Sequence, residues 1–274
     1  MNGYSVRSDV DRKMYRINMM TGVASELGPT GFSKIEALAI NPAGEIFGVN
    51  PASAQLVKCL STTGACSAVG LLNGVAQLQT NAGMAFSAAG VLYLAINAVV
   101  YRVDPLTAAA VALGSSGPAL SGLAGVAPSA TCASGLFGIG GNTDRGKFYC
   151  INVSNGVATL LGTIGLTPLD SGLDGDSVTG LVWGVSNDTP GQVFAIDPET
   201  LALSNLNTVT LGGSPLGGFE SLAIVHVADE LAGATPVPTL SEIALIVLAL
   251  SMAAVMTLTL SQRARAAAKM SRRK

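Results

Sequence analysis

Residues 13–28 read KMYRINMMTGVASELG, and this stretch sets the pattern for most of the chain. Apolar residues alternate up to a Thr-Gly pair and a second short run returns after it, so the stretch predicts a β-hairpin. The Asn before such a turn can fold its side chain onto the backbone, and Gly accepts positive φ. Four later segments repeat the pattern, and their anchor residues recur at spacings of 42, 44, 48 and 45 residues: Ile17, Cys59, Val103, Ile151 and Ile196.

A second pair of predicted strands lies between these hairpins, in segments that start at Glu36, Ala82, Gly122 and Ser177. Four strands at a period of about 40–50 residues are typical of a β-propeller blade. The last unit has only ESLAIVHV, residues 220–227, while NGYSV at residues 2–6 matches the strand that it lacks. We therefore predict an all-β propeller over residues 1–228 with five four-stranded blades, closed by the N-terminal strand at the outer edge of the last blade. Six or more blades stay open as an alternative if further sequence lies upstream.

The hairpin segments resemble the LYRID-x-x-TG units of exported bacterial propellers, over nearly all of residues 1–230. The resemblance implies the propeller fold and export, but a fold by itself says little about activity. One aromatic position recurs in the units, and we expect its rings to pack in the core rather than to form a binding stripe: Tyr15, Tyr101, Tyr149 and Phe194.

The C-terminal region has a different composition. Residues 243–260 contain no charge, Pro or Gly, and as an α-helix they would reach about 27 Å, close to the thickness of a bilayer core. Basic residues follow without an acidic one: Arg263, Arg265, Lys269, Arg272, Arg273 and Lys274. The positive-inside rule then predicts one transmembrane helix with a cytoplasmic C-terminus, joined to the propeller by a linker at 229–236. A buried core helix with a solvated tail is the alternative, although core helices normally keep a polar face.

A six-residue motif stands directly before the apolar run: Val237, Pro238, Thr239, Leu240, Ser241 and Glu242. Residues 237–274 resemble the IPTL-CTERM sorting signal of Gram-negative bacteria, which is similar in plan to the PEP-CTERM signals handled by exosortase-type enzymes. Val237 stands where that family has Ile, and Ile243 stands where it has Trp. The resemblance implies an exported protein of the cell envelope or surface, with an exosortase-type sorting enzyme as a partner.

The N-terminus, MNGYSVRSDVDRKMYRI, lacks the basic and apolar regions of a secretory signal peptide. We expect that a signal has been removed or lies upstream of the sequence. Insertion through the tail alone is the alternative.

Charge and cysteine content agree with an exported domain. Residues 1–241 carry nine Lys or Arg and sixteen Asp or Glu, a net charge of −7, which argues against nucleic acid as a partner. The four cysteines form an even set, as expected in an oxidising compartment. Cys59 and Cys66 are symmetric about a Thr-Thr-Gly turn, so opposed strand positions would bring them within disulfide reach. A Cys132–Cys150 pair follows by elimination.

The long Gly-rich segments are predicted to be the connections that gather at one mouth of the ring, and they start at Gly28, Gly70, Gly114, Gly162 and Thr208. Long loops at one end of a rigid scaffold commonly bind ligands, so we expect a glycan or protein ligand there. Asp170, Asp174 and Asp176 in LDSGLDGDS offer the oxygen donors that Ca²⁺ prefers. Their spacing does not match an EF-hand and acidic Gly-Ser loops are commonly just solvated, so the sequence assigns no metal ligand and implies no cofactor.

Catalytic residues are not assigned. His226 is the only histidine and sits in an apolar strand, and no G-x-S-x-G motif occurs. A paired-carboxylate hydrolase stays open, because pairing is spatial. The sequence favours a non-enzymatic, membrane-anchored or sorted binding or structural module of the envelope or extracellular matrix. The alternatives are an exported polysaccharide hydrolase or lyase, which clustered carboxylates in the channel would favour, and a subunit of a cell-surface assembly.

Overall fold

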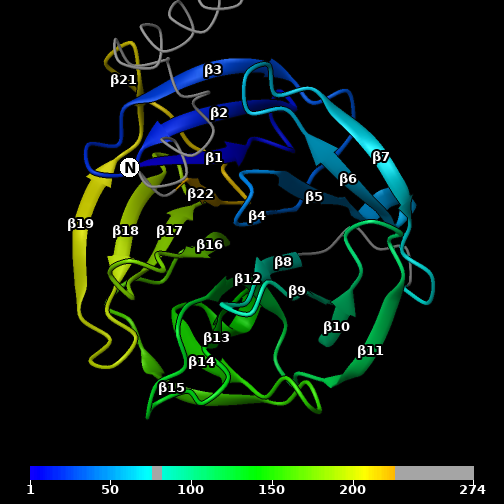
Figure 1. Ribbon diagram of the computed structural model, residues 1–274. Coiled ribbons are helices and arrows are strands. Elements are labelled where there is room, and N and C mark those ends of the chain that lie inside the picture. The colour runs from blue at the N-terminus through cyan, green and yellow to red at the C-terminus, as the bar shows by residue number, and fades with distance from the viewer. Residues whose placement is uncertain (76–81, 226–274) are drawn as a thin grey trace, which may run out of the picture. The chain divides into compact units, whose positions relative to one another are not determined.

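The computed structural model describes residues 1–75 and 82–225 of the chain. The chain divides into two units, Met1–Gly233 and Ala234–Lys274. The described strands belong to the first unit and form five four-stranded antiparallel sheets and one two-stranded hairpin. Figure 1 shows the five sheets as blades around a common centre. The predicted five-bladed, all-β propeller is therefore confirmed.

Each blade runs from an innermost to an outermost strand. The closing blade contains β22 (Ala223–Val225), β1 (Asn2–Val6), β2 (Lys13–Asn18) and β3 (Ala24–Pro29). Blade two contains β4 (Ala37–Ile40), β5 (Ile46–Asn50), β6 (Gln55–Cys59) and β7 (Cys66–Leu71). Blade three contains β8 (Ala82–Phe86), β9 (Leu92–Ile96), β10 (Val99–Val103) and β11 (Ala110–Ser115).

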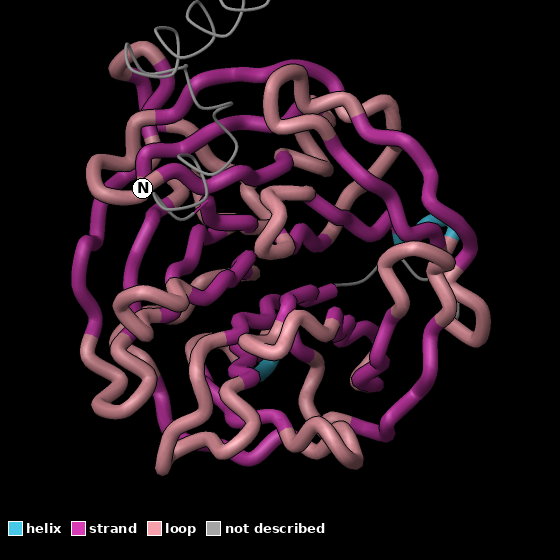
Figure 2. The backbone as a smooth tube through the Cα atoms, in the orientation of Figure 1, coloured by secondary structure: helices cyan, strands magenta, loops and turns pink. Residues whose placement is uncertain are grey.

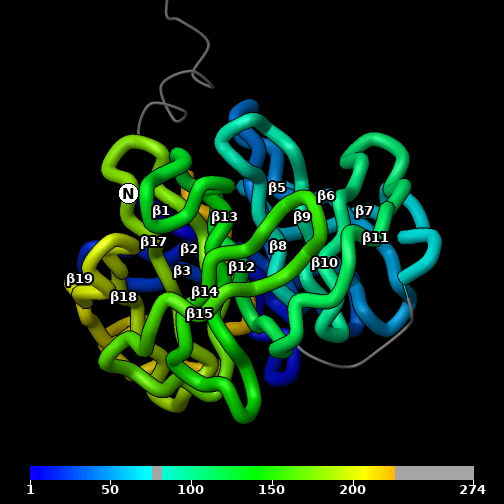
Figure 3. The backbone as a smooth tube through the Cα atoms, turned by 90° about the horizontal axis from the view of Figure 1, so that it is seen from below, coloured from blue at the N-terminus to red at the C-terminus, as the bar shows by residue number. Residues whose placement is uncertain are grey.

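The remaining two blades follow the same order. Blade four, which faces the viewer in Figure 3, contains β12 (Leu120–Gly125), β13 (Leu136–Gly140), β14 (Lys147–Ile151) and β15 (Ala158–Thr163). Blade five contains β16 (Ser171–Gly175), β17 (Val182–Ser186), β18 (Gln192–Ile196) and β19 (Leu203–Thr208). The small hairpin pairs β20 (Thr210–Leu211) with β21 (Ser214–Pro215). Figure 2 shows that strands and loops make up nearly all of the described backbone, apart from the short 3₁₀ turns Pro51–Ser53 and Asn142–Asp144.

The outer hairpins share one turn geometry, as the repeat predicts. In each turn a backbone N–H donates to the carbonyl four residues earlier; the Gly22 N–H, for example, donates to the Asn18 carbonyl at 2.8 Å. The Asn18 side chain accepts a further bond from the Met20 N–H at 3.0 Å. Asp104, Asn152 and Asp197 accept in the same way in their own turns. The predicted folding of Asp or Asn onto the backbone is confirmed.

Ring closure differs in one respect from the prediction. β1 pairs with β22, with Gly3 opposite Ile224, so the N-terminal strand does complete the last blade. However, β1 is the second strand of that blade, and β3 forms its outer edge. The N-terminal segment supplies three strands because the C-terminal segment contributes only the innermost one.

The core lies within and between the blades. Tyr15, Tyr101, Tyr149 and Phe194 are all buried, so the recurring aromatic position is a packing position as predicted. At the centre, neighbouring inner strands lie backbone to backbone. A Cβ built on Gly172 of β16 would stand 2.2 Å from the Ser221 carbonyl carbon, which explains why this position holds glycine.

The predictions for the C-terminal region fall outside the described residues. These are the linker 229–236, the helix 243–260 and the basic end of the tail, together with His226. Among residues 1–75 and 82–225, no helix combines the length and the hydropathy that crossing a bilayer requires.

Candidate functional site

Three acidic residues stand just before inner strands. Glu36 precedes β4, Asp170 precedes β16, and Glu220 lies three residues before β22. β16 and β22 run side by side in the same direction, since Gly172 lies against Ser221 and Leu222, and further along the Ile224 N–H donates to the Asp174 carboxylate at 2.8 Å. These strands therefore begin at the same mouth of the ring, where the blade-to-blade connections arrive.

Two of these carboxylates meet a third one from the β1–β2 connection. Asp9, Glu36 and Glu220 each offer an oxygen, and the three oxygens lie within 4.8 Å of one another. The Lys34 ammonium lies 3.1 Å from an Asp9 oxygen and 2.7 Å from Glu36 Oε1. The group of Asp9, Lys34, Glu36 and Glu220 is called the acidic cluster below.

The backbone beside the acidic cluster is held by hydrogen bonds between distant segments. The Ser8 hydroxyl donates to the Ile35 carbonyl, and the Ile35 N–H donates back to Ser8 Oγ at 3.2 Å. This reciprocal pair positions the next residue of each segment, which is Asp9 in one and Glu36 in the other. The Glu220 N–H donates to the Val6 carbonyl at 3.3 Å, which holds Glu220 against the end of β1.

Glu220 is a buried and electrostatically perturbed member of the cluster. It is 5 % exposed, its Oε1 accepts from the Asn187 amide at 3.1 Å, and its buried Oε2 has no hydrogen-bond partner. Burial raises the pKa of Glu220 to about 7. The negative charge of Asp9 and a side-chain hydrogen bond with it add to this increase, while the Lys34 ammonium opposes it. Burial likewise raises the pKa of Asp170, whose charge acts on Glu220, to about 6.

The cluster is reached from solvent through Asp9. Its side chain is 61 % exposed, whereas Glu36 is 3 % exposed. A hollow of about 330 Å³ opens beside it, and the lining residues are Ser8, Asp9, Val10, Asp11, Arg12 and Ser33. Three neighbouring carboxylates that are open to solvent on one side can bind a cation or exchange protons with a bound molecule.

The acidic segment LDSGLDGDS is not the exposed loop that the sequence predicts. Asp170 directly precedes strand β16 and Asp174 lies within it. Both side chains are buried, as is that of Asp176. Asp174 accepts backbone N–H bonds from Ile224 and Gly175, and Asp176 caps the following turn by accepting from the Thr179 hydroxyl at 2.6 Å. The prediction of a solvated loop is wrong, because these carboxylates are used to join inner strands and to close a turn.

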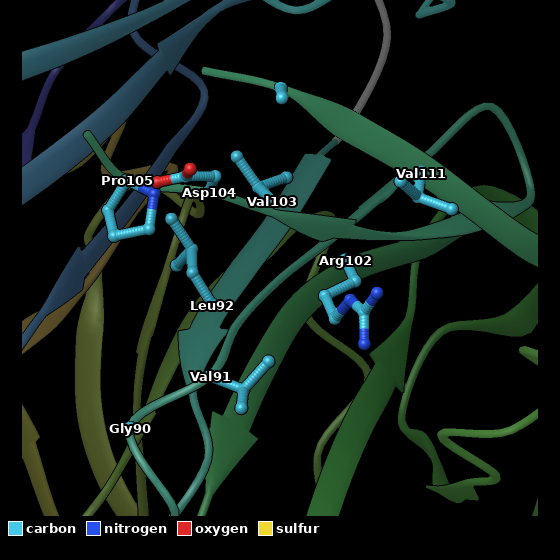
Figure 4. A pocket seen from close by; sticks show the side chains of 9 residues that line it. Gly90, Val91, Leu92, Arg102, Val103, Asp104, Pro105 and Val111 are labelled. Carbon is cyan, nitrogen blue, oxygen red and sulfur yellow. The ribbon is translucent and has the colours of Figure 1, made fainter. Parts of the chain in front are cut away.

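Other hollows of the first unit are less suited to chemistry. The one in Figure 4, of about 340 Å³, is lined only by residues of blade three, with Arg102 and Asp104 as its charged groups. A smaller cavity, of about 200 Å³, is lined by residues from the far ends of β4, β8, β12 and β16 and includes Asp174. It marks the opposite mouth of the ring.

Sequence reasoning missed the acidic cluster, although one signal for it was present. The segments EALAI at 36–40 and ESLAI at 220–224 place Glu at the same position of two units. Core packing does not need a charge there, so the recurrence could have marked both residues. Nothing in the sequence placed Asp9 or Lys34 beside them.

Both cysteine pairs form disulfides. Cys59 and Cys66 are opposed residues of β6 and β7 with Cα atoms 3.9 Å apart, which confirms the prediction from the turn. Cys132 and Cys150 form the second bond with Cα atoms 5.4 Å apart, as elimination suggested.

Comparison with known proteins supports the interpretation of the C-terminal end. Residues 235–265 match the IPTL-CTERM motif. The match includes the six-residue motif at 237–242, so the chain carries this sorting signal. Together with the two disulfides, the IPTL-CTERM motif suggests export to the cell surface. The finer type of the propeller repeat, resembling LYRID-x-x-TG units, stays a prediction.

Two solved structures show a weak overall similarity to this chain. A nidogen/laminin complex matches at 14 % identity with a TM-score of 0.49, covering 80 % of this chain and 82 % of that one. Virginiamycin B lyase from Staphylococcus aureus matches at 16 % identity with a TM-score of 0.41, covering 71 % of this chain and 62 % of the lyase chain. Neither likeness bears on ligand or activity. No curated protein matches the sequence.

Proposed function

We propose that this protein is an exported β-propeller that is sorted or anchored at the cell envelope through its C-terminal signal and acts there as a binding or structural module. The observation that carries the proposal is the combination of a closed, disulfide-bonded propeller with an IPTL-CTERM motif at residues 235–265. In this proposal residues 243–260 cross the inner membrane once before any processing, and an exosortase-type enzyme recognises residues 237–242.

The ligand of the module is a glycan or a protein bound at the mouth where the blade-to-blade connections arrive. The acidic cluster lies at this mouth and gives it excess negative charge, since it contains three carboxylates and one ammonium. Ligands with basic or hydroxyl-rich groups suit such a surface, because carboxylates are hydrogen-bond acceptors.

Protease shaving of intact cells tests the export proposal. We expect external protease to cleave the propeller, and mass determination of both mature ends to place any C-terminal cleavage near Pro238. Replacing residues 237–242 by alanine should abolish sorting, whereas replacing 229–233, outside the matched motif, should leave it intact. A full-length cytosolic protein that retains Lys274 and has reduced thiols would contradict the proposal.

An exported hydrolase or lyase acting on polysaccharide is the second candidate, and the acidic cluster is the observation that favours it. Glu220, with a pKa of about 7, is suited to donate a proton near neutral pH, and a neighbouring carboxylate from Asp9 or Glu36 would serve as its partner. A panel of polysaccharides assayed for new reducing ends or unsaturated products tests this role. Turnover that survives Glu220→Gln would exclude the assignment.

A further inference from the structure

The acidic cluster joins segments that are far apart in the chain. Glu220 comes from the end of the propeller sequence, Asp9 from its first connection, and Glu36 from the connection into blade two. These carboxylates are brought within 4.8 Å only because β1 pairs with β22 and closes the ring. A ligand shared by all three would therefore bind the closed ring and not the open chain.

The charges of the cluster do not balance. Among the described residues, Lys34 is the one cation that forms ion pairs with the cluster, and its partners are Asp9 and Glu36. Asp170 adds further negative charge, which acts on Glu220. Like charges held this close repel one another, so a second positive charge is favoured here.

Glu220 independently points to a bound ion. Its buried Oε2 accepts no hydrogen bond from an N–H or hydroxyl group, and its Oε1 is held by the Asn187 amide. The hydrogen bond that Glu220 can share with the Asp9 carboxyl needs a proton between the two groups. Buried carboxylate oxygens are nearly always paired, because leaving one unpaired costs the full penalty of removing it from water. A cation within the cluster would provide the missing partner.

We propose that Asp9, Glu36 and Glu220 bind a calcium ion, which displaces the Lys34 ammonium and ties the closing blade to blade two. All the donors are oxygens, as calcium prefers, and they come from three separate segments without regular geometry. Magnesium demands near-ideal octahedral geometry, which suits such a set less well. The exposed side of Asp9 and the hollow beside it leave room for the water molecules that complete a calcium shell.

Lys34 acts as a built-in competitor in this proposal. Its ammonium lies between two of the ligands, and its long side chain can swing into solvent once the ion arrives. Removing this charge should therefore strengthen calcium binding, whereas removing a ligand charge should weaken it. These opposite effects separate a specific site from a variant that merely fails to fold.

Titration calorimetry on the full chain in mild detergent, after chelator treatment and dialysis, tests the site. We expect one calcium ion per chain and a higher melting temperature in calcium than in chelator. Glu220→Gln should weaken binding at least tenfold, and Lys34→Met should strengthen it at least threefold. Magnesium chloride, titrated separately, should bind more weakly than calcium.

The exposed Glu45–Lys58 ion pair of blade two provides matched controls. Glu45→Gln and Lys58→Met make the same charge changes as the two site variants and should leave calcium affinity unchanged. The proposal is overturned if millimolar calcium gives neither saturable heat nor a shift in melting temperature, or if Glu220→Gln binds like the wild type. Tighter binding of magnesium would overturn the calcium assignment. The calcium site does not depend on export. Protease shaving can therefore contradict the proposed function while calorimetry supports the site, and the reverse is equally possible.

Discussion

Asp174 shows how one residue links the inner strands and makes stability depend on pH. Its carboxylate accepts N–H bonds from Ile224 of the closing blade and from Gly175. Burial raises the pKa of Asp174 to about 7, which outweighs those two hydrogen bonds, and the charge of Asp176 adds to the increase. In the unfolded chain the same carboxyl would titrate near its usual value of about 3.9.

The sign of the pH effect follows from these values. Between the unfolded and the folded pKa the native state binds more protons than the unfolded state, so stability falls as pH rises through this window. Glu220 and Asp170, whose pKa values are also raised, act in the same direction. We expect a higher melting temperature at pH 5 than at pH 8, measured in chelator so that no ion compensates Glu220.

Asp174→Asn should flatten this pH dependence. The amide loses one acceptor oxygen, which lowers stability by about 1 kcal/mol at low pH, where the wild-type carboxyl is protonated. It cannot ionise, so it avoids the desolvation cost that the wild type acquires as pH rises. Thermal melts of wild type and variant at pH 5 and pH 8 measure the difference. An unchanged difference between the two pH values would show that Asp174 is not the group responsible.

At the scale of elements, the inner strands pack too closely for side chains at certain positions. A Cβ on Gly172 of β16 would meet the Ser221 carbonyl carbon at 2.2 Å and the Leu222 nitrogen at 2.4 Å, both backbone atoms of the neighbouring segment. In the same way, a Cβ on Gly122 of β12 would lie 2.5 Å from the Ser171 carbonyl oxygen. Backbone atoms cannot rotate aside as a side chain can, so a methyl group there must push two blades apart.

Gly172→Ala should therefore destabilise the propeller. Overpacking of this kind typically costs about 1–3 kcal/mol, and a clash with backbone belongs at the upper end. Gly165→Ala is the matched control, because its Cβ would meet only Leu203 Cδ1 at an ordinary 3.6 Å. Chemical denaturation of both variants measures the effect. Equal stability of the two would contradict the close packing of β16 against the closing blade.

The propeller depends on closure of the ring by its first and last strands, β1 and β22. β22 contributes one strand to the closing blade, and it is joined to the other three through β1 alone. Four of the five residues of β1 are buried: Gly3, Tyr4, Ser5 and Val6. This strand is therefore part of the core and not an exposed edge strand.

Removal of residues 1–6 should prevent a stable ring from forming. The deletion separates β22 from β2 and exposes unpaired edges on both, which favours aggregation over closure. We expect the truncated protein to lose its cooperative unfolding transition and its stabilisation by calcium. Calorimetry and light scattering, with the full chain as the reference, measure these losses. A truncated protein that melts at the wild-type temperature would disprove this role of β1.

Much of the fold could be predicted because its signals are local. The turn residues of the outer hairpins, such as Asn18 and Gly22, act within five residues of one another. The Cys59–Cys66 bond joins directly opposed residues of one hairpin, so its geometry also follows from the turn. The place of the N-terminal strand was predicted less well: it was expected at the outer edge of the last blade, but it lies second, between β22 and β2.

The sequence by itself determined the blade period, the closure by both ends, one disulfide and the C-terminal sorting motif, because each is written in neighbouring residues or in a repeat. Only the tertiary structure decided that Asp174 is buried between inner strands rather than solvated on a loop. It also decided that Asp9, Glu36 and Glu220 converge. Proximity between residues two hundred positions apart arises when the ring closes, and no local pattern encodes it.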